Sequence, residues 1–178
     1  MYLELLKYPI GRYKAVGIVS KDYINECIDV ICDFPDKMAK VVQGLDAELD
    51  WKYRPEGWSI RQVVHHCADS HMNSFVRFKL AMTESIPTIK PYDEAAWAEM
   101  SDYTEVDISY SLDILRGLHH RWVKVLADMQ SVDWERVLIH PEHGGQIKIG
   151  WMTGLYRWHC EHHLAHIQQA KESKGKFN

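Results

Sequence analysis

Four histidines lie within the C-terminal stretch Arg157-Trp158-His159-Cys160-Glu161-His162-His163-Leu164-Ala165-His166. The surrounding residues 150–173 have the three-and-four spacing of a helix with one inward stripe. On such a helix His159 and His163 share a face, because residues four apart have Cβ atoms about 5–6 Å from each other. Two imidazoles at this spacing can hold one metal ion, whose bonds to nitrogen are about 2.0–2.1 Å long.

A third ligand must come from another part of the chain, and His66 is the best candidate. It lies in Trp58-Ser59-Ile60-Arg61-Gln62-Val63-Val64-His65-His66, where Ser59 is a suitable N-cap for a helix over residues 59–84. Much of that helix is apolar, yet one stripe carries the polar side chains of His66, Ser70, Asn73 and Arg77. Polar groups on a buried helix need partners, which a metal and a wet pocket would supply.

The rest of the chain predicts a helical bundle. Residues 20–45 and 108–130 have helical periodicity, although Pro35 should kink or break the first of these helices. Residues 135–149 change to the pattern of a short β-hairpin before the last helix. Residues 1–19 are expected to form an extended arm, and residues 85–107 a long crossover with one helical turn near 92–98. We interpret residues 1–178 as a single domain.

His119 lies on the apolar stripe of the helix predicted at 108–130. A lone histidine in this position is more often a buried core residue than a ligand, but a fourth ligand or a pocket base stays open. Three His-His pairs, His65-His66, His119-His120 and His162-His163, lie on three predicted helices, and one member of each pair points inward. This repetition favours a metal site over the alternative of buried structural histidines or a pH-sensitive core.

Composition excludes several classes of function. The 178 residues carry a formal net charge of −4, which gives no sign of a nucleic-acid partner. The chain has no apolar run of the ~20 residues that a membrane span needs, and its N-terminus lacks the features of a signal peptide. A cytoplasmic protein that acts on a small molecule is therefore expected.

The histidines indicate metal chemistry without defining the reaction. They do not form H-E-x-x-H, because Cys160 follows His159 and His163 follows His162. A three-histidine site leaves a position open for water or substrate, and zinc can lower the pKa of a bound water to about 7. The same site could instead activate a thiolate.

Several motifs resemble the DinB-like superfamily, and in particular proteins of the YfiT type, which are described as proposed metal-dependent hydrolases. The resemblance covers nearly the whole chain, including Tyr53-Arg54-Pro55, Arg77-Phe78-Lys79-Leu80, Tyr92-Asp93-Glu94-Ala95-Ala96-Trp97, His140-Pro141-Glu142-His143-Gly144 and the final histidine helix. It implies an all-α four-helix bundle, commonly a homodimer, with one zinc or nickel ion per chain. Carried over, the ligands are His66, His159 and His163.

Three functional hypotheses follow. The leading one is a metal-dependent hydrolase, in which Asn73 and Arg77 line the pocket, Arg77 pairs with an anionic group of the substrate and Asp69 orients an imidazole. The second is a thiol S-transferase, since the wider superfamily includes enzymes that use bacillithiol or mycothiol. The third is a non-catalytic metal-binding module with every ligand position filled, for which His119 or His166 would be the fourth ligand.

Overall fold

Four long helices build the molecule, and they match the four that periodicity predicts to within a few residues at each end. The computed structural model describes residues 2–17 and 19–178. The long helices are α2 (Lys21–Val42), α3 (Ile60–Thr83), α6 (Ile108–Asp128) and α7 (Ile149–Ser173). The smaller elements are α1 (Tyr2–Lys7), η1 (Ala47–Asp50), α4 (Glu94–Ala98), α5 (Ser101–Glu105), η2 (Asp133–Glu135), β1 (Val137–His140), η3 (Pro141–His143) and β2 (Gly145–Lys148).

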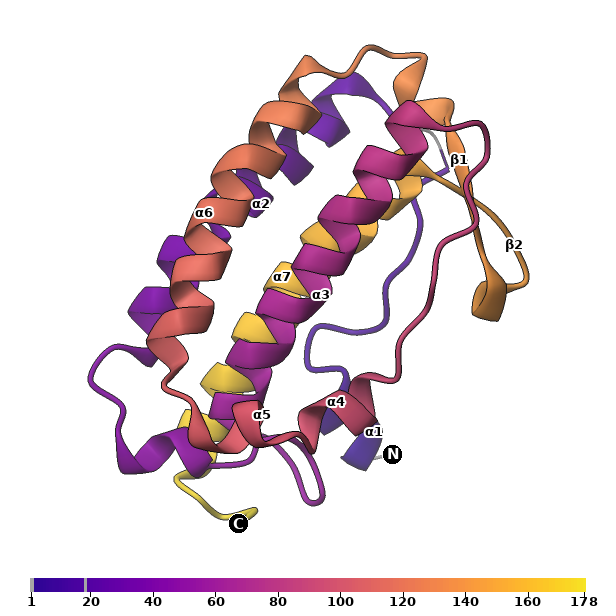
Figure 1. Ribbon diagram of the computed structural model, residues 1–178. Helices are drawn as coiled ribbons and strands as arrows, with labels where there is room; N and C mark the ends of the chain where they lie inside the picture. Colours follow the sequence, from indigo (N-terminus) through magenta and orange to yellow (C-terminus); the bar gives the residue numbers. More distant parts are fainter. Residues whose placement is uncertain (1, 18) are drawn as a thin grey trace.

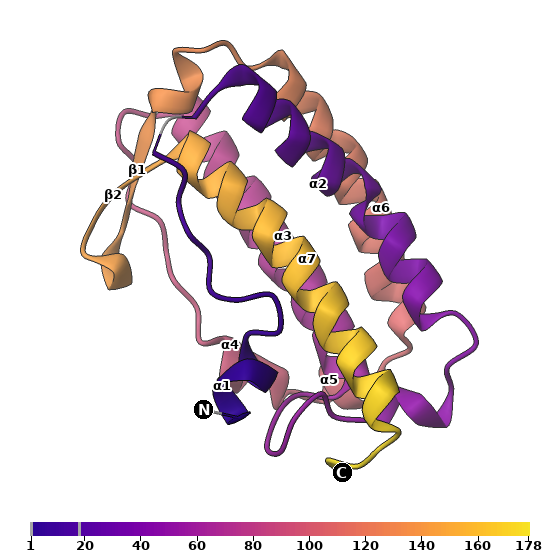
Figure 2. The same cartoon turned by 180° about the vertical axis from the view of Figure 1, so that it is seen from behind.

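The packing order of the long helices departs from their order in the chain. Helix α2 packs against α6 and α7, and α3 packs against the same two helices. Helices α2 and α3 therefore occupy opposite corners of a four-helix bundle (Figures 1 and 2). Figure 1 also shows that α2 and α7 run in one direction while α3 and α6 run in the other. Two pairs of neighbouring helices are thus parallel, α2 with α7 and α3 with α6. Because α3 and α6 run in the same direction, a long crossover has to return the chain from the end of α3 to the start of α6.

The crossover lies along the outside of the bundle and is held there by the hairpin (Figure 1). Strands β1 and β2 pair antiparallel, which confirms the predicted hairpin. The backbone N–H of Ile89 donates to the carbonyl of Ile139 at 3.0 Å, and the N–H of Ile139 donates to the carbonyl of Pro87 at 2.9 Å. The predicted turn near 92–98 is α4, whereas the second short helix, α5, was not expected.

The N-terminal segment is only partly the extended arm that the sequence predicts, because α1 is helical and the extended part follows it. Met1 and Ile18, which that prediction includes, lie outside the described residues. The extended part is fastened to α7 by two hydrogen bonds. The hydroxyl of Tyr13 donates to the Trp151 carbonyl at 3.0 Å, and Nε1 of Trp158 donates to the Gly11 carbonyl at 3.0 Å.

Helix α2 continues through Pro35, so of the two effects expected of this proline, a kink or a break, the break does not occur. Proline has no N–H, and the carbonyl four residues earlier loses its helical donor. That carbonyl belongs to Ile31, and it accepts a hydrogen bond from Nδ1 of His119 on α6 at 2.6 Å. A donor from a neighbouring helix thus replaces the one that proline lacks.

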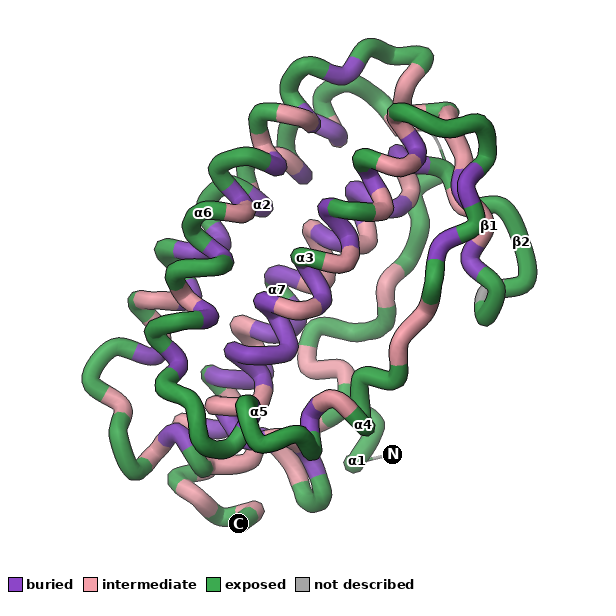
Figure 3. Tube along the Cα trace, viewed as in Figure 1, coloured by how far each residue is buried: buried purple, intermediate pink, exposed green. Residues whose placement is uncertain are grey.

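The core runs along the inner faces of the four long helices, as the burial colours in Figure 3 show. Trp122 is fully buried and meets Phe78 and Tyr156 edge to face at 5.4 and 5.3 Å between ring centroids. Such pairs contribute beyond their buried area. Within the described ranges, no helix has the length and apolarity that crossing a membrane demands.

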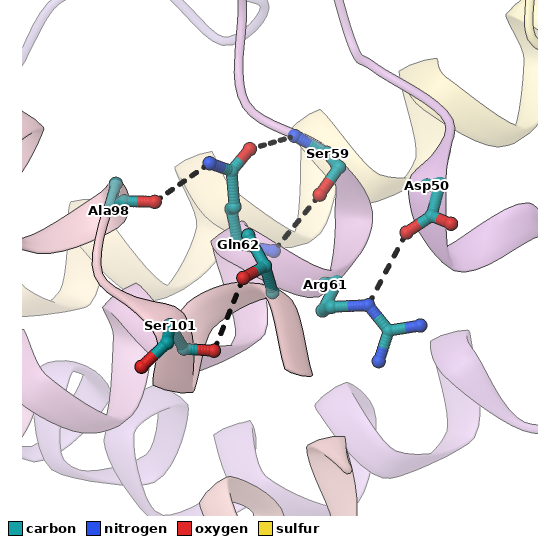
Figure 4. Close-up of polar contacts among 7 residues, drawn as sticks. Asp50, Ser59, Arg61, Gln62, Ala98 and Ser101 are labelled. Carbon is teal, nitrogen blue, oxygen red and sulfur yellow. Dashed lines mark hydrogen bonds and ion pairs between the residues drawn. The ribbon is translucent and has the colours of Figure 1, made fainter. Parts of the chain in front are cut away.

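The start of α3 is fixed by a capping box at Ser59 and Gln62 (Figure 4). The Ser59 hydroxyl accepts from the N–H of Gln62 at 3.2 Å, and the Gln62 side chain accepts from the N–H of Ser59 at 2.9 Å. The amide of Gln62 also donates to the Ala98 carbonyl at 2.9 Å, which ties α4 to α3. This cap sets where α3 begins, and therefore which face of the helix points inward.

Replacing Ser59 with Ala should lower the free energy of unfolding by about 1 kcal/mol, because a backbone N–H at the helix start loses its acceptor. Denaturation with urea measures the change. Ser59→Thr retains the hydroxyl and should recover most of the loss. Equal stability of Ser59→Ala and the wild type would show that the capping box contributes nothing.

Candidate metal centre

Three histidines from two helices converge in the middle of the bundle. His66 comes from α3, and His159 and His163 come from successive turns of α7. One potential ligand atom from each lies within 4.8 Å of the other two. His66 and His163 are buried, and His159 is partly exposed. The structure thus brings together the three residues that the sequence singles out.

The spacing of the nitrogens suits a single divalent ion. Nε2 of His66 lies 3.3 Å from Nε2 of His159. Two nitrogens bound to one tetrahedral ion at about 2.0–2.1 Å are separated by roughly 3.3–3.4 Å. The pair therefore already has the separation that shared coordination requires, and imidazole nitrogen is a common ligand of both zinc and nickel.

Burial keeps these rings in the neutral form that binds a metal. Desolvation, followed by the nearby His162, lowers the pKa of His66 to about 4. Desolvation and then the neighbouring histidines lower the pKa values of His159 and His163 well below the usual range. A ring nitrogen can bind a metal only when it carries no proton, so competition from protons is weak at neutral pH.

Two hydroxyl groups and an indole border the cluster. The Ser70 hydroxyl lies 3.4 Å from Nε2 of His159 and 3.2 Å from the hydroxyl of Tyr156. Tyr156 donates its own proton to the Ser70 carbonyl at 3.1 Å. The proton of the Ser70 hydroxyl is therefore free to point toward the nitrogen cluster. Trp58 packs against the ring of His66, with 4.7 Å between ring centroids.

The structure does not support His119 or His166 as a fourth ligand. Nδ1 of His119 is bonded to the Ile31 carbonyl, and its Nε2 lies 2.7 Å from Nδ1 of His71. His166 has Nε2 bonded to the Lys7 carbonyl at 3.1 Å and Nδ1 3.4 Å from Nδ1 of His163. The ring nitrogens of both side chains are therefore engaged with other groups and do not complete the three-histidine cluster.

The side chains of Asn73, Arg77 and Asp69, which were also predicted to belong to the site, each bond to a different part of the chain. The Asn73 amide donates to the carbonyl of Asp69 one turn earlier, at 2.9 Å, which is a contact within α3. The Arg77 guanidinium donates to the Lys90 carbonyl in the crossover at 3.3 Å, and its charge lowers the pKa of Tyr156 against the larger effect of burial. Asp69 accepts a hydrogen bond from Tyr103 at 2.7 Å, and its role in orienting an imidazole stays a prediction.

His71 is the residue that sequence reasoning missed. It is fully buried, and its Nε2 lies 3.0 Å from Nδ1 of His159. Its position in the sequence is typical of a core residue, because His71 is four residues after Cys67 and four before Phe75 and so lies on an apolar stripe. The feature that could have identified it is a histidine in the middle of an apolar stripe, on the same helix as His66.

Comparison with known proteins agrees with the bundle and the cluster. A profile of the DinB superfamily matches residues 33–167, and the chain belongs to this superfamily. It is 44% identical over 171 residues to YfiT of Bacillus subtilis (strain 168), with 96% of each chain covered. It is 49% identical over 162 residues to a relative from Oceanobacillus iheyensis, covering 90% of this chain and 93% of the relative. Both relatives are named as proposed metal-dependent hydrolases.

A solved structure extends the agreement to three dimensions. The structure of YfiT from Bacillus subtilis superposes with a TM-score of 0.93 at 43% identity, covering 96% of this chain and 98% of the other. It is described as having an unusual four-helix bundle topology. That description fits the diagonal placement of α2 and α3, and the predicted all-α four-helix bundle is confirmed.

The metal-free protein should lose stability as the pH falls from about 6.5 toward 4. Burial lowers the pKa of His66, His119 and His162 to about 4 in the folded chain, against about 6.5 in the unfolded chain. Between these values the unfolded chain binds more protons, so each such histidine reduces the free energy of unfolding by up to about 1.4 kcal/mol per pH unit. Urea denaturation of chelator-treated protein at pH 7, 6 and 5 measures the slope.

His162→Gln should make this slope shallower, because one proton-binding group is removed from the unfolded chain without changing the three-histidine cluster. An identical slope in His162→Gln and the wild type would contradict the assignment.

Proposed function

We propose that this protein is a metal-dependent hydrolase whose zinc or nickel ion is held by His66, His159 and His163. The observation that carries the proposal is the separation of 3.3 Å between the Nε2 atoms of His66 and His159, in a cluster where two rings are buried and the third is partly exposed. When bound, such an ion supplies Lewis acidity and an activated water near neutral pH. The names of the relatives support the same reaction class.

The chain's own residues would bind and orient the substrate beside the cluster. The Ser70 hydroxyl, 3.4 Å from Nε2 of His159, can donate to a carbonyl or phosphoryl oxygen placed there. Tyr156 fixes Ser70 through its hydrogen bond to the Ser70 carbonyl, and burial raises the pKa of Tyr156, so the phenol keeps its proton. Ser70 therefore acts as a pre-oriented donor.

Arg77 would bind an anionic group of the substrate. Its charge lowers the pKa values of Tyr92 and Tyr156 against the larger effect of burial, which supports a guanidinium close to the wall that Ser70 belongs to. Among the described residues the buried hydroxyl of Tyr92 has no hydrogen-bond partner, and it offers a further polar contact. We propose Asn73 as a lesser contact, because its amide nitrogen is already bonded within α3.

Two alternatives make different predictions. A thiol S-transferase would use the same open position to activate a low-molecular-weight thiol of the bacillithiol type. A non-catalytic module would need every ligand position filled, and the engagement of His119 and His166 elsewhere argues against it. A cytoplasmic location and assembly as a homodimer stay predictions.

Purified protein should contain about one zinc or nickel ion per chain, because three imidazoles form a complete catalytic-type site. His163→Ala should lose most of it, since two ligands remain. Elemental mass spectrometry measures the content. His162→Ala is the control, because His162 is the adjacent residue and is outside the cluster. Absence of metal from the wild type, even after incubation with zinc and nickel, would overturn the proposal.

Arg77→Ala should keep its metal and raise KM for carboxylate-bearing ester or amide substrates by about 10- to 100-fold, the effect of losing a hydrogen bond to a charged group. Lys79→Ala removes an exposed charge from the same helix and should leave KM unchanged. The assay compares hydrolysis of an aryl ester and amide panel with conversion of electrophiles in the presence of a thiol. Turnover only with added thiol would replace the hydrolase with the S-transferase, and metal loss in Arg77→Ala would make Arg77 structural.

A further inference from the structure

Pro35 creates a hydrogen-bond acceptor in the middle of the bundle. Because it has no N–H, the Ile31 carbonyl has no helical donor, and Nδ1 of His119 approaches that oxygen to 2.6 Å. A carbonyl oxygen can only accept a hydrogen bond. Nδ1 of His119 therefore carries a proton, and this assignment depends only on the geometry.

The assignment at His119 determines the protons of the next two rings. His119 and His71 are buried, and their hydrogen-bond partners are ring nitrogens and one backbone carbonyl, none of which is an anion that would stabilise a charged ring. A neutral imidazole has one donor and one acceptor. Nε2 of His119 thus accepts from Nδ1 of His71 at 2.7 Å, and Nε2 of His71 accepts from Nδ1 of His159 at 3.0 Å.

The proton on Nδ1 of His159 determines which nitrogen of this ring can bind a metal. With its proton on Nδ1, the free lone pair of His159 is on Nε2, which is the atom that lies 3.3 Å from Nε2 of His66. We propose that His71 and His119 are positioning residues: they form a hydrogen-bond chain from the Ile31 carbonyl to His159 that presents the Nε2 lone pair of His159 to the metal. The part of this inference that concerns metal rests on the proposed function.

The chain passes through all four long helices and is held by an aromatic side chain. Ile31 is on α2, His119 on α6, His71 on α3 and His159 on α7. The Phe34 ring lies 4.9 Å from the His71 ring and 5.4 Å from the His119 ring, between centroids. Phe34 follows Ile31 by one helical turn, so α2 supplies both the acceptor and the packing that orients the two rings.

A second, shorter hydrogen-bond chain ends at His163. Nε2 of His166 donates to the Lys7 carbonyl at 3.1 Å, so its Nδ1 can accept from Nδ1 of His163 at 3.4 Å. Here too the Nε2 lone pair of the cluster histidine is left free. Hydrogen bonds to the second nitrogen commonly fix the tautomer of metal-binding histidines, and removing them typically weakens metal binding by about 10- to 100-fold.

The first test needs no metal. Nitrogen-15 NMR of the histidine rings in chelator-treated wild-type protein at pH 7 identifies which nitrogen carries each proton. His71, His119 and His159 should all be protonated at Nδ1 and bare at Nε2, with assignments made by comparing single histidine variants. A proton on Nε2 of His71 or His159 would reverse the chain and overturn the proposal.

The second test measures zinc affinity by competition with a chromophoric chelator. His71→Phe keeps an aromatic ring and removes both nitrogens, so affinity should fall by about 10- to 100-fold. His119→Phe should weaken binding less, because His71 still contacts His159. His65→Phe is the matched control: His65 is a buried histidine of the same helix, bonded to Ser111 at 2.8 Å. Thermal denaturation establishes that each variant is folded.

The two tests separate this proposal from the proposed function. Wild-type zinc affinity in folded His71→Phe and His119→Phe would overturn the positioning role while leaving the metal site intact. If the wild type binds neither zinc nor nickel, the proposed function fails, and the NMR result still decides whether the hydrogen-bond chain exists. If His71→Phe does not fold, the wild-type tautomers and the zinc affinity of His119→Phe decide whether the positioning role holds.

Discussion

The structure depends on one constraint, which is that imidazole rings buried inside a helical bundle must find hydrogen-bond partners there. An unpaired polar group in an apolar interior costs several times what a good hydrogen bond contributes. For His71, His119 and His159 the bundle meets this constraint with groups from three of the long helices, α2, α3 and α6: a carbonyl freed by Pro35, a hydroxyl from Ser70, and the rings of His71 and His119. The cluster of His66, His159 and His163 lies at the end of this series of hydrogen bonds, and the Nε2 atoms of His66 and His159 are 3.3 Å apart.

The long helices, the hairpin and the cap at Ser59 could be predicted from sequence, because each depends on residues close together in the chain. Three-and-four periodicity places α3, α6 and α7 directly, and the i,i+4 pair of His159 and His163 is a local fact. His66 could be added from its polar stripe and from the family resemblance. Nothing comparable marks α1, which is six residues long with no buried side chain.

Pro35 and His71 were misjudged for the same physical reason. The sequence rule for proline considers one helix alone, whereas the donor that satisfies the Ile31 carbonyl comes from a residue 88 positions away. Likewise, His71 has the spacing of a packing residue, and its function depends on His159, which lies 88 positions further along the chain. Local patterns predict helices, but which polar groups meet inside the bundle depends on how the helices are arranged.

The diagonal arrangement of α2 and α3 has a consequence for how the protein reaches its native state. In an up-and-down bundle, neighbouring helices in the chain pack first and folding is fast, because the contacts are local. Here α2 packs against α6 and α7, and His66 and His159, which meet in the cluster, are 93 residues apart in the chain. Closing such large loops carries an entropic cost before any contact compensates for it. The bundle must therefore fold more slowly than its helix content suggests, and on the ribosome the cluster can assemble only after α7 has been synthesised.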